Sequence, residues 1–251
     1  MEHVAATIDA AHLRAAELDA DGLPVGDLAT AYRVQAALTR RRTARGSHRI
    51  GWKLGYTSQA MRAQMGIDRP NHGPLLSDMV IGDGDTLPAG LIHPRVEPEI
   101  ALRLARTPPA GAGPEEVLAA CASAHAALEV VDSAWRDYRF DVEHNTADGS
   151  SAAGVVLGPQ LPLSRLDEVA VTLEVDGRAV ASGRGADAAG HPAAALAWLV
   201  GALAEAGETL RPDDVVITGG LTAAHPVGPG GAVSATFAHP DGARVQVTVR
   251  R

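Results

Sequence analysis

The sequence predicts an α+β fold in which a helical N-terminal region precedes mostly antiparallel strands. Three observations support this class. Apolar positions recur at helical spacing in the first fifty residues, Asp176-Gly177 separates two alternating segments, and the tail is rich in valine and in Gly/Pro turns. Because the helices come first and do not alternate regularly with strands, the order differs from that of a doubly wound parallel sheet.

Two helices are expected at the N-terminus. The first covers about 4–18, and Asp27 is a suitable N-cap for the second. The second helix ends near Gly46 after a basic turn at 40–42, which we interpret as cations at a helix C-terminus and not as a phosphate site. We expect residues 1–46 to pack on the β core of a single catalytic domain.

The remaining elements follow from alternation and from breaker residues. Strands are predicted at 49–56, 95–104 and 126–132, helices at 57–66, from about 114 and at 192–206, a hairpin of 169–175 with 178–182, and short strands after 214. Thr57 or Ser58 would cap the helix that ends at Gly66.

Composition restricts the classes of partner. The chain has 251 residues, of which 46% are hydrophobic, so it can bury a sizeable core. A net charge of −8 disfavours a nucleic-acid or anionic-membrane partner. The single cysteine, Cys121, fits a reducing compartment, and no signal peptide or bilayer-spanning apolar run is seen. We therefore expect a cytoplasmic protein.

The strand predicted at 95–104 carries two glutamates on one face. Because alternate residues of a strand share a face, Glu97 and Glu99 lie together, opposite an apolar layer. Neighbouring carboxylates in a partly buried site stay ionised only where a cation compensates them. Pro98 removes a ladder donor, which suggests an edge strand or a bulge.

A third carboxylate, Glu129, lies in the apolar run at 126–131, where an ionised side chain is costly to bury alone. Three carboxylates without Cys or His describe an oxygen-only site, which favours Mg²⁺ or Mn²⁺ over zinc. The residues alone leave alternatives open. Glu-x-Glu is commonly the solvated face of a strand, and Glu129 alone fits a salt-bridged core residue.

Several motifs occur in order along the chain. They are 51–58 (GWKLGYTS), 73–79 (GPLLSDM), 93–99 (HPRVEPE), 127–129 (ALE) with Asp132, 146–148 (TAD) with 152–154 (AAG), and 219–222 (GGLT). Together they resemble the 2-oxopent-4-enoate hydratase and 4-oxalocrotonate decarboxylase family, within the fumarylacetoacetate-hydrolase-like superfamily. The resemblance extends over nearly the whole chain.

The resemblance implies a fumarylacetoacetase-like mixed β-roll core, a homo-oligomer and a role in aromatic catabolism. It implies that Mg²⁺ or Mn²⁺ is held by Glu97, Glu99 and Glu129, and that a small 2-oxo acid chelates the metal through its 1-carboxylate and 2-oxo oxygens. It also implies catalytic roles for Lys53 and Asp148, and substrate contacts from Asn71, His72, Leu76 and Thr222.

The roles of these residues keep alternatives. Lys53 would donate a proton or hold the substrate carboxylate, unless it is a solvated strand lysine. Asp148 is an acid or base, or it holds a neighbouring loop. Thr222 fits a hydrogen-bond donor to substrate better than a catalyst.

Two positions depart from the family pattern. Hydratases of the family carry Pro-Asp-aromatic-Gly where this chain has Pro70-Asn71-His72-Gly73, and an Asn cannot exchange a proton at neutral pH. His72 would either take over the proton role or, as we favour, replace the aromatic side chain in packing. Gly149 stands in place of an Asn.

The resulting hypothesis is a metal-dependent lyase that adds water to a 2-hydroxy-2,4-dienoate to give a 4-hydroxy-2-oxo acid. The enolate that forms along the conjugated chain would be stabilised by the divalent ion. The alternatives are decarboxylation of a 4-oxalocrotonate-type 2-oxo diacid, hydrolysis of a 2,4-dioxo acid, and a biosynthetic or non-catalytic relative on the same scaffold.

Overall fold

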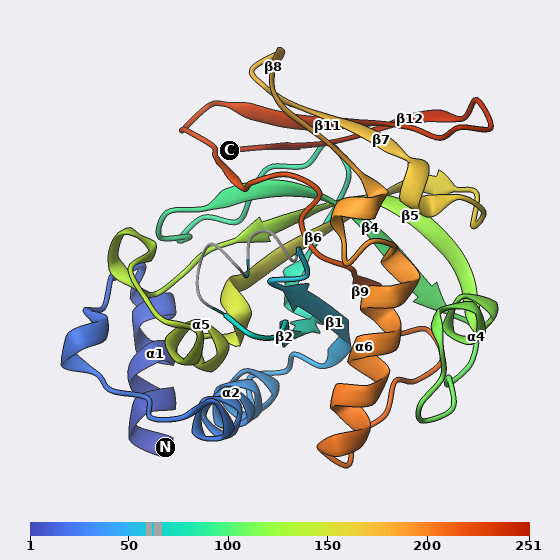
Figure 1. Ribbon diagram of the computed structural model, residues 1–251. Helices are drawn as coiled ribbons and strands as arrows, with labels where there is room; N and C mark the ends of the chain where they lie inside the picture. The colour runs from blue at the N-terminus through green and yellow to red at the C-terminus, as the bar shows by residue number, and fades with distance from the viewer. Residues whose placement is uncertain (59–61, 63–66) are drawn as a thin grey trace.

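Two β-sheets and flanking helices form the protein in a computed structural model, which describes residues 1–58, 62 and 67–251 (Figure 1). The larger, eight-stranded sheet has the order β2-β1-β9-β4-β5-β6-β3, with β10 paired to β4. Its strands are β1 (Arg49–Gly55), β2 (Asn71–Leu76), β3 (Val80–Ile81), β4 (Arg95–Leu104), β5 (Cys121–Val131), β6 (Ala152–Leu161), β9 (Val215–Ile217) and β10 (His225–Pro226).

The smaller sheet is antiparallel and has the order β12-β11-β7-β8. Its strands are β7 (Ala170–Val175), β8 (Arg178–Arg184), β11 (Ala232–Ala238) and β12 (Arg244–Arg250). The larger sheet is mixed, since β1 pairs parallel with β9 and β3 pairs parallel with β6. The α+β prediction is therefore confirmed, and the curved larger sheet is the central feature of Figure 1.

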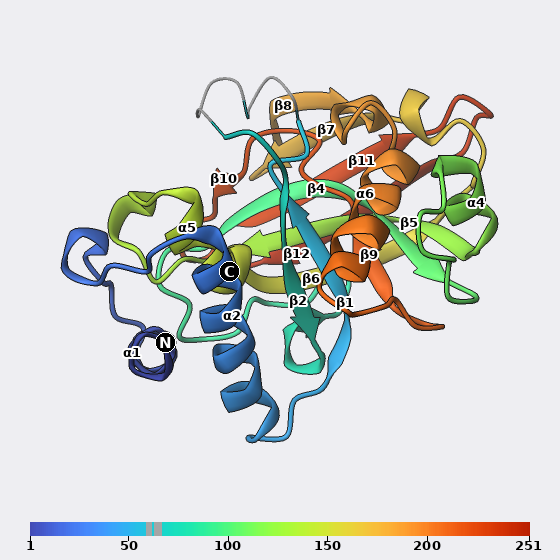
Figure 2. The same cartoon turned by 60° about the horizontal axis from the view of Figure 1, so that its bottom comes forward.

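The helices form two groups that both views keep apart (Figures 1 and 2). One group comprises α1 (Glu2–Arg14), α2 (Leu28–Thr43) and α5 (Val142–Ala147), and the other comprises α4 (Pro114–Ala119) and α6 (Pro192–Glu205). The first group surrounds its own apolar cluster, which includes Ile8, Val34 and Trp135. No helix in the described ranges is both long and apolar enough to cross a membrane.

Local chemistry explains several boundaries. The Asp27 side chain accepts a hydrogen bond from the Thr30 amide at 2.8 Å, so the predicted N-cap of α2 is confirmed. Asp176 and Gly177 both have positive φ angles, of 51° and 72°, as the predicted two-residue hairpin requires. The first helix ends earlier than predicted, because Ala15 adopts a left-handed conformation.

Other expectations differ from the structure. The strand predicted at 126–132 begins at Cys121, and strands β2 and β6 were not predicted. The inference of an edge strand or bulge at Pro98 is wrong, since β4 lies between β9 and β5 without a register shift there. Instead, Pro98 lies between the paired stretches of β9 and β10, where its carbonyl accepts from the Leu221 amide at 2.9 Å. The helix expected at 57–66 falls largely outside the described residues.

The two faces of β4 and β5 have different environments. Val96, Ile100 and Leu128 face the main apolar cluster, which also contains residues of the smaller sheet and of α6. Ala101 and Ala127 belong to a separate cluster on the opposite face. Strand alternation places Glu97, Glu99 and Glu129 on this second face.

Candidate metal and active site

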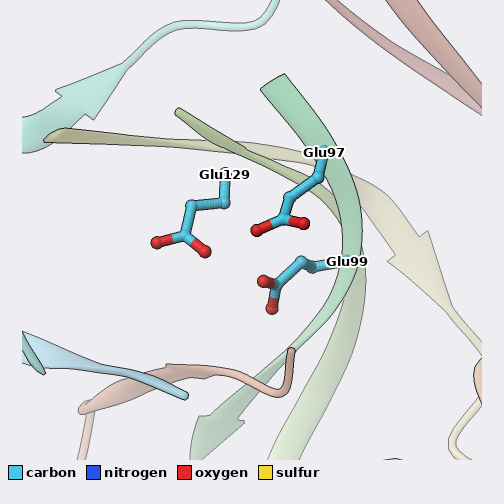
Figure 3. A group of neighbouring side chains, drawn as sticks. All are labelled: Glu97, Glu99 and Glu129. Carbon is cyan, nitrogen blue, oxygen red and sulfur yellow. The ribbon is translucent and has the colours of Figure 1, made fainter. Parts of the chain in front are cut away.

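Three glutamates converge on the second face of the larger sheet. Glu97 and Glu99 project from β4 and Glu129 from β5, where Glu97 and Glu129 are direct cross-strand partners. One carboxylate oxygen of each lies within 4.8 Å of the others, and Figure 3 shows the three carboxylates facing one another. Glu99 and Glu129 are completely buried, whereas Glu97 keeps some solvent contact. The structure thus brings together the three predicted metal ligands.

The protein leaves several of these oxygens without a hydrogen-bond donor. Glu99 Oε1 and Glu129 Oε2 are buried and accept no hydrogen bond, and Glu129 Oε1 has only an ion pair with Lys53. Burial and the adjacent charge of Glu129 raise the pKa of Glu97 to about 8 and hold the pKa of Glu99 well above its ordinary value. Burial likewise raises the pKa of Glu129, although Lys53 opposes this. Such a cluster is costly as anions unless a cation joins it.

Lys53 is the cation closest to this cluster. Its Nζ lies 3.1 Å from Glu129 Oε1 and donates to the Ser150 carbonyl at 2.9 Å, and the residue is only 4% exposed. Burial lowers the pKa of Lys53, but the charges of Glu129, Glu97 and Glu99 outweigh burial and raise it overall. The interpretation as a solvated strand lysine is therefore wrong. Lys53 is also the only lysine of the chain, since all the others of its 22 Lys and Arg residues are arginines.

A glycine loop closes one side of the cluster. The Gly219 amide donates to Glu99 Oε2 at 2.6 Å, and a Cβ at Gly220 would lie 2.2 Å from Glu97 Oε2. Gly219 has a φ of 109°, and a Cβ there would lie 1.9 Å from Thr57 Oγ1, so a side chain would fit neither its backbone nor its surroundings. Thr222 follows in the same loop, where its hydroxyl donates to the Ala223 carbonyl at 2.9 Å.

Asn71 and His72 serve the scaffold in this structure. The Asn71 amide donates to Asn145 Oδ1 and to Thr146 Oγ1, both at 2.9 Å, and its oxygen accepts from Ser150 Oγ at 2.9 Å. His72 stacks on Tyr32 with ring centroids 4.6 Å apart, as the packing interpretation requires. Burial lowers the pKa of His72 to about 4, so its ring is neutral at neutral pH.

Asp148 is occupied by structural contacts. It accepts from the Ala134 amide at 2.8 Å and from Ser133 Oγ at 3.2 Å, and its other oxygen lies 2.6 Å from His12 Nε2. These contacts fit the loop-holding alternative. Asp148 and Leu76 also line a cavity of about 220 Å³ between α1, α2 and the sheet, and none of the three glutamates is among its described lining residues.

Some features of the site were not recognised from the sequence. The glycines that contact Glu97 and Glu99 lie far away in the chain, and no local pattern indicated that contact. His12, which joins α1 to Asp148, also gave no signal. The status of Lys53 as the sole lysine, by contrast, is visible in the composition and singles out that position.

Comparison with known proteins identifies the family. Residues 50–250 match the family model described as fumarylacetoacetate (FAA) hydrolase, C-terminal. A 2-keto-4-pentenoate hydratase of Burkholderia vietnamiensis is 40% identical over 230 residues, which cover 88% of this chain and 86% of the relative. A 4-oxalocrotonate decarboxylase of a Pseudomonas species is 36% identical over 241 residues, 91% of each chain.

A solved structure is similar over the whole fold. The 4-oxalocrotonate decarboxylase from Pseudomonas putida G7, complexed with magnesium and adipate, has a TM-score of 0.92 and 32% sequence identity, and the match covers 99% of this chain and 96% of that one. The chain therefore belongs to the fumarylacetoacetate hydrolase family, in the group that contains the 2-keto-4-pentenoate hydratases and the 4-oxalocrotonate decarboxylases.

Proposed function

We propose that this chain is a divalent-metal-dependent lyase that adds water to a 2-hydroxy-2,4-dienoate to give a 4-hydroxy-2-oxo acid. The observation that carries the proposal is the buried carboxylate cluster of Glu97, Glu99 and Glu129 with Lys53 beside it. The relative from B. vietnamiensis, named a 2-keto-4-pentenoate hydratase, supports this reaction class. We further propose that the enzyme acts in the cytoplasm, as a homo-oligomer.

The three glutamates fit Mg²⁺ or Mn²⁺. They offer only oxygen donors, and the buried oxygens of Glu99 and Glu129 that lack a hydrogen-bond partner are those that a cation would satisfy. When bound, such a metal would supply positive charge that stabilises the developing enolate oxygen of a 2-oxo acid. The two 4-oxalocrotonate decarboxylase structures of the same fold, one complexed with magnesium and one with calcium, support binding of a divalent ion.

Lys53 is the residue that we assign to proton transfer or to holding the substrate carboxylate. Its ammonium group is fixed by the Ser150 carbonyl and by Glu129, on the same side of the sheet as the cluster. A lysine can release a proton whereas an arginine cannot, which gives a reason for the chain's only lysine to stand here. Asp148 contributes through the loop that carries Ser150, and not as an acid or base.

The polar network of Asn71 supports a positioning role. All three of its hydrogen bonds connect β2 to the segment 145–150, which also supplies the carbonyl that holds Lys53. His72 completes the packing beneath β1. Water addition would then depend on Lys53 and on a water held near Glu97, the partly exposed ligand, in place of an aspartate at position 71.

Decarboxylation of a 4-oxalocrotonate-type diacid is the second candidate. It is favoured by the similarity to the Pseudomonas decarboxylases in sequence and in structure. The carboxylate cluster would serve both reactions, because each passes through charge on the 2-oxo oxygen. The two candidates differ in their products, which are a hydrated acid in one case and CO₂ in the other.

The test is a mass and ultraviolet time course with freshly generated 2-hydroxypenta-2,4-dienoate, first with Mg²⁺ and then with chelator. We expect a gain of one water that stops on chelation and is lost in Glu99→Ala. A parallel reaction with 4-oxalocrotonate measures release of CO₂. Glu205→Gln, on an exposed turn of α6, is the control.

Each outcome decides between the candidates. Hydration without CO₂ release supports the hydratase, and CO₂ release without hydration supports the decarboxylase. If Mg²⁺ binds with normal affinity and neither product forms, the proposed lyase function is wrong.

A further inference from the structure

The turn that contacts Lys53 has an unusual backbone. Gly149, Ser150 and Ser151 have positive φ angles of 67°, 57° and 57°, the longest such run in the part of the chain that the structure describes. Left-handed backbone is unfavourable for residues that have a Cβ, and it normally occurs at single positions. Two consecutive serines in this conformation therefore form a strained turn, which the surrounding protein must enforce.

Contacts on both sides hold this left-handed turn in place. The Ser151 carbonyl accepts a hydrogen bond from the Asp132 amide, and Ser151 Oγ accepts one from the Asn145 side-chain amide, both at 2.9 Å. On the other side β2 packs directly against the turn, because a Cβ at Gly73 would collide with the Gly149 carbonyl. The fold thus maintains a conformation that the local sequence disfavours.

The left-handed conformation gives Ser150 two polar contacts. Its carbonyl accepts from Lys53 Nζ at 2.9 Å, and its hydroxyl donates to Asn71 Oδ1 at 2.9 Å. Ser150 is 2% exposed and Asn71 is completely buried, so water does not compete for the hydroxyl contact. Because the carbonyl and the hydroxyl belong to one residue, the contact with Asn71 restricts the direction in which the carbonyl points.

The ammonium group of Lys53 depends on such a fixed acceptor. A lysine side chain is flexible, and its three N–H groups rotate unless acceptors hold them. The Ser150 carbonyl holds one of them, and Glu129 Oε1 lies 3.1 Å from the same nitrogen. Together these two acceptors set the orientation of the ammonium group and of the N–H that remains for a substrate.

We propose that Ser150 is a positioning residue, whose left-handed backbone directs its carbonyl at Lys53 and whose hydroxyl, held by Asn71, maintains that direction. This inference rests on the proposed function, in which Lys53 acts on the substrate. It also accounts for an asparagine at position 71. The Asn71 side chain donates to Asn145 and Thr146 and accepts from Ser150, whereas a carboxylate has only acceptors.

The single lysine allows a direct test. Protein without a lysine-containing tag, grown with lysine labelled with ¹⁵N at Nζ, gives one side-chain ammonium signal in an NMR spectrum. In the Mg²⁺-loaded wild-type protein the hydrogens of this group should exchange slowly with water, because Lys53 is buried and has two acceptors. In Ser150→Ala, which lacks the hydroxyl, we expect exchange to be about 10-fold faster, the size expected for the loss of one hydrogen bond.

Two more variants complete the comparison. Ser150→Gly also lacks the hydroxyl but adopts the left-handed backbone without strain, so it should show the same faster exchange even if the alanine variant folds poorly. Ser123→Ala is the matched control, because it loses a hydroxyl contact with His125 near the start of β5, away from Lys53. Its exchange rate should equal that of wild type.

Steady-state kinetics with 2-hydroxypenta-2,4-dienoate give a second measurement. In both Ser150 variants kcat/KM should fall about 10-fold, because the ammonium group is no longer held in its reactive orientation. The Mg²⁺ affinity should stay within about 2-fold of wild type, since Glu97, Glu99 and Glu129 are unchanged. A purely structural role for Ser150 would lower stability and leave both ammonium exchange and kcat/KM unchanged.

The outcomes separate this inference from the proposed function. If ammonium exchange or kcat/KM in both Ser150 variants equals that of wild type, the assignment of Ser150 is overturned and the lyase proposal stands. If exchange becomes faster but wild-type protein turns over neither 2-hydroxypenta-2,4-dienoate nor 4-oxalocrotonate, the lyase proposal is wrong and the placement of Lys53 by Ser150 stands.

Discussion

Neutralising one glutamate of the cluster should stabilise the metal-free protein. Glu97→Gln keeps the shape of the side chain and removes one of three adjacent negative charges. An ordinary surface substitution of this kind changes stability little. Here the wild-type carboxylate is held near Glu129 in a buried setting, so its ionisation opposes folding.

The pKa of Glu97 gives the size and the pH window of the effect. A rise from 4.5 to about 8 means that the folded state retains a proton that the unfolded state has released. Stability of the metal-free wild-type protein therefore falls as pH increases from about 4.5 to about 8. At about 1.4 kcal/mol for each pH unit the full effect is roughly 5 kcal/mol. Because Glu97 keeps some solvent contact, we expect about 2–4 kcal/mol.

Urea unfolding at pH 5 and at pH 8.5, with chelator and then with Mg²⁺, would measure this effect. With chelator, Glu97→Gln should be more stable than wild type by about 2–4 kcal/mol at the higher pH and nearly equal at the lower pH. With Mg²⁺, the wild type should gain about 2.7 kcal/mol at a hundred times its dissociation constant, and the variant much less.

Glu205→Gln provides the control, since Glu205 is exposed on α6 and should show neither effect. A Glu97→Gln variant that is less stable than wild type at pH 8.5 in chelator would refute the electrostatic reasoning. The same conclusion would follow if Mg²⁺ stabilised both proteins equally, because Glu97 would then not be a ligand.

Three further substitutions probe the surroundings of the cluster. Lys53→Arg keeps the positive charge, but an arginine cannot release a proton, so kcat should fall by roughly 100-fold or more. The Mg²⁺ affinity measured by calorimetry should stay similar. Retention of most activity would show that only the charge at position 53 matters. Gly220→Ala forces the Glu97 carboxylate to move, so the affinity for Mg²⁺ should fall about 10-fold or more with little loss of stability. Gly228→Ala is the control, because a Cβ there has no atom within 4 Å, and it should change neither Mg²⁺ affinity nor stability. His12→Gln removes the contact with Asp148. Burial lowers the pKa of His12, but the charge and hydrogen bond of Asp148, together with the charge of Asp132, raise it overall. Because this pKa is raised, the contact stabilises the folded protein fully below about pH 6.5 and loses its effect at higher pH. In denaturant unfolding, the variant should be less stable than wild type by about 1 kcal/mol at pH 6 and by less at pH 9. An equal loss of stability at both pH values would contradict this.

Much of the fold follows from local patterns in the sequence. The boundaries of β4 were predicted correctly because alternation and flanking turns act over a few residues, and Asp27 was recognised as a cap for the same reason. The pairing of Glu97 with Glu129 could be inferred only through the family resemblance, since cross-strand register depends on the whole sheet. Pro98 shows the limit of a local rule. Proline is accommodated in this interior strand because neither β9 nor β10 pairs with β4 at position 98. That arrangement depends on the tertiary structure and is not visible in the local sequence.

The roles of polar residues were harder to predict than their positions. The family resemblance implied substrate contact for Asn71 and catalysis for Asp148, yet the side chains of both are hydrogen-bonded to neighbouring protein groups. Arg95 shows the reverse, since it gave no signal in the sequence beyond its place in a motif, stacks on the Tyr138 ring and has no ion-pair or hydrogen-bond partner among the described residues. A polar side chain is available to a ligand only where the fold leaves its hydrogen-bonding capacity unused. By that criterion the buried oxygens of Glu99 and Glu129 that accept no hydrogen bond are available to a cation, and Lys53 lies beside Glu129.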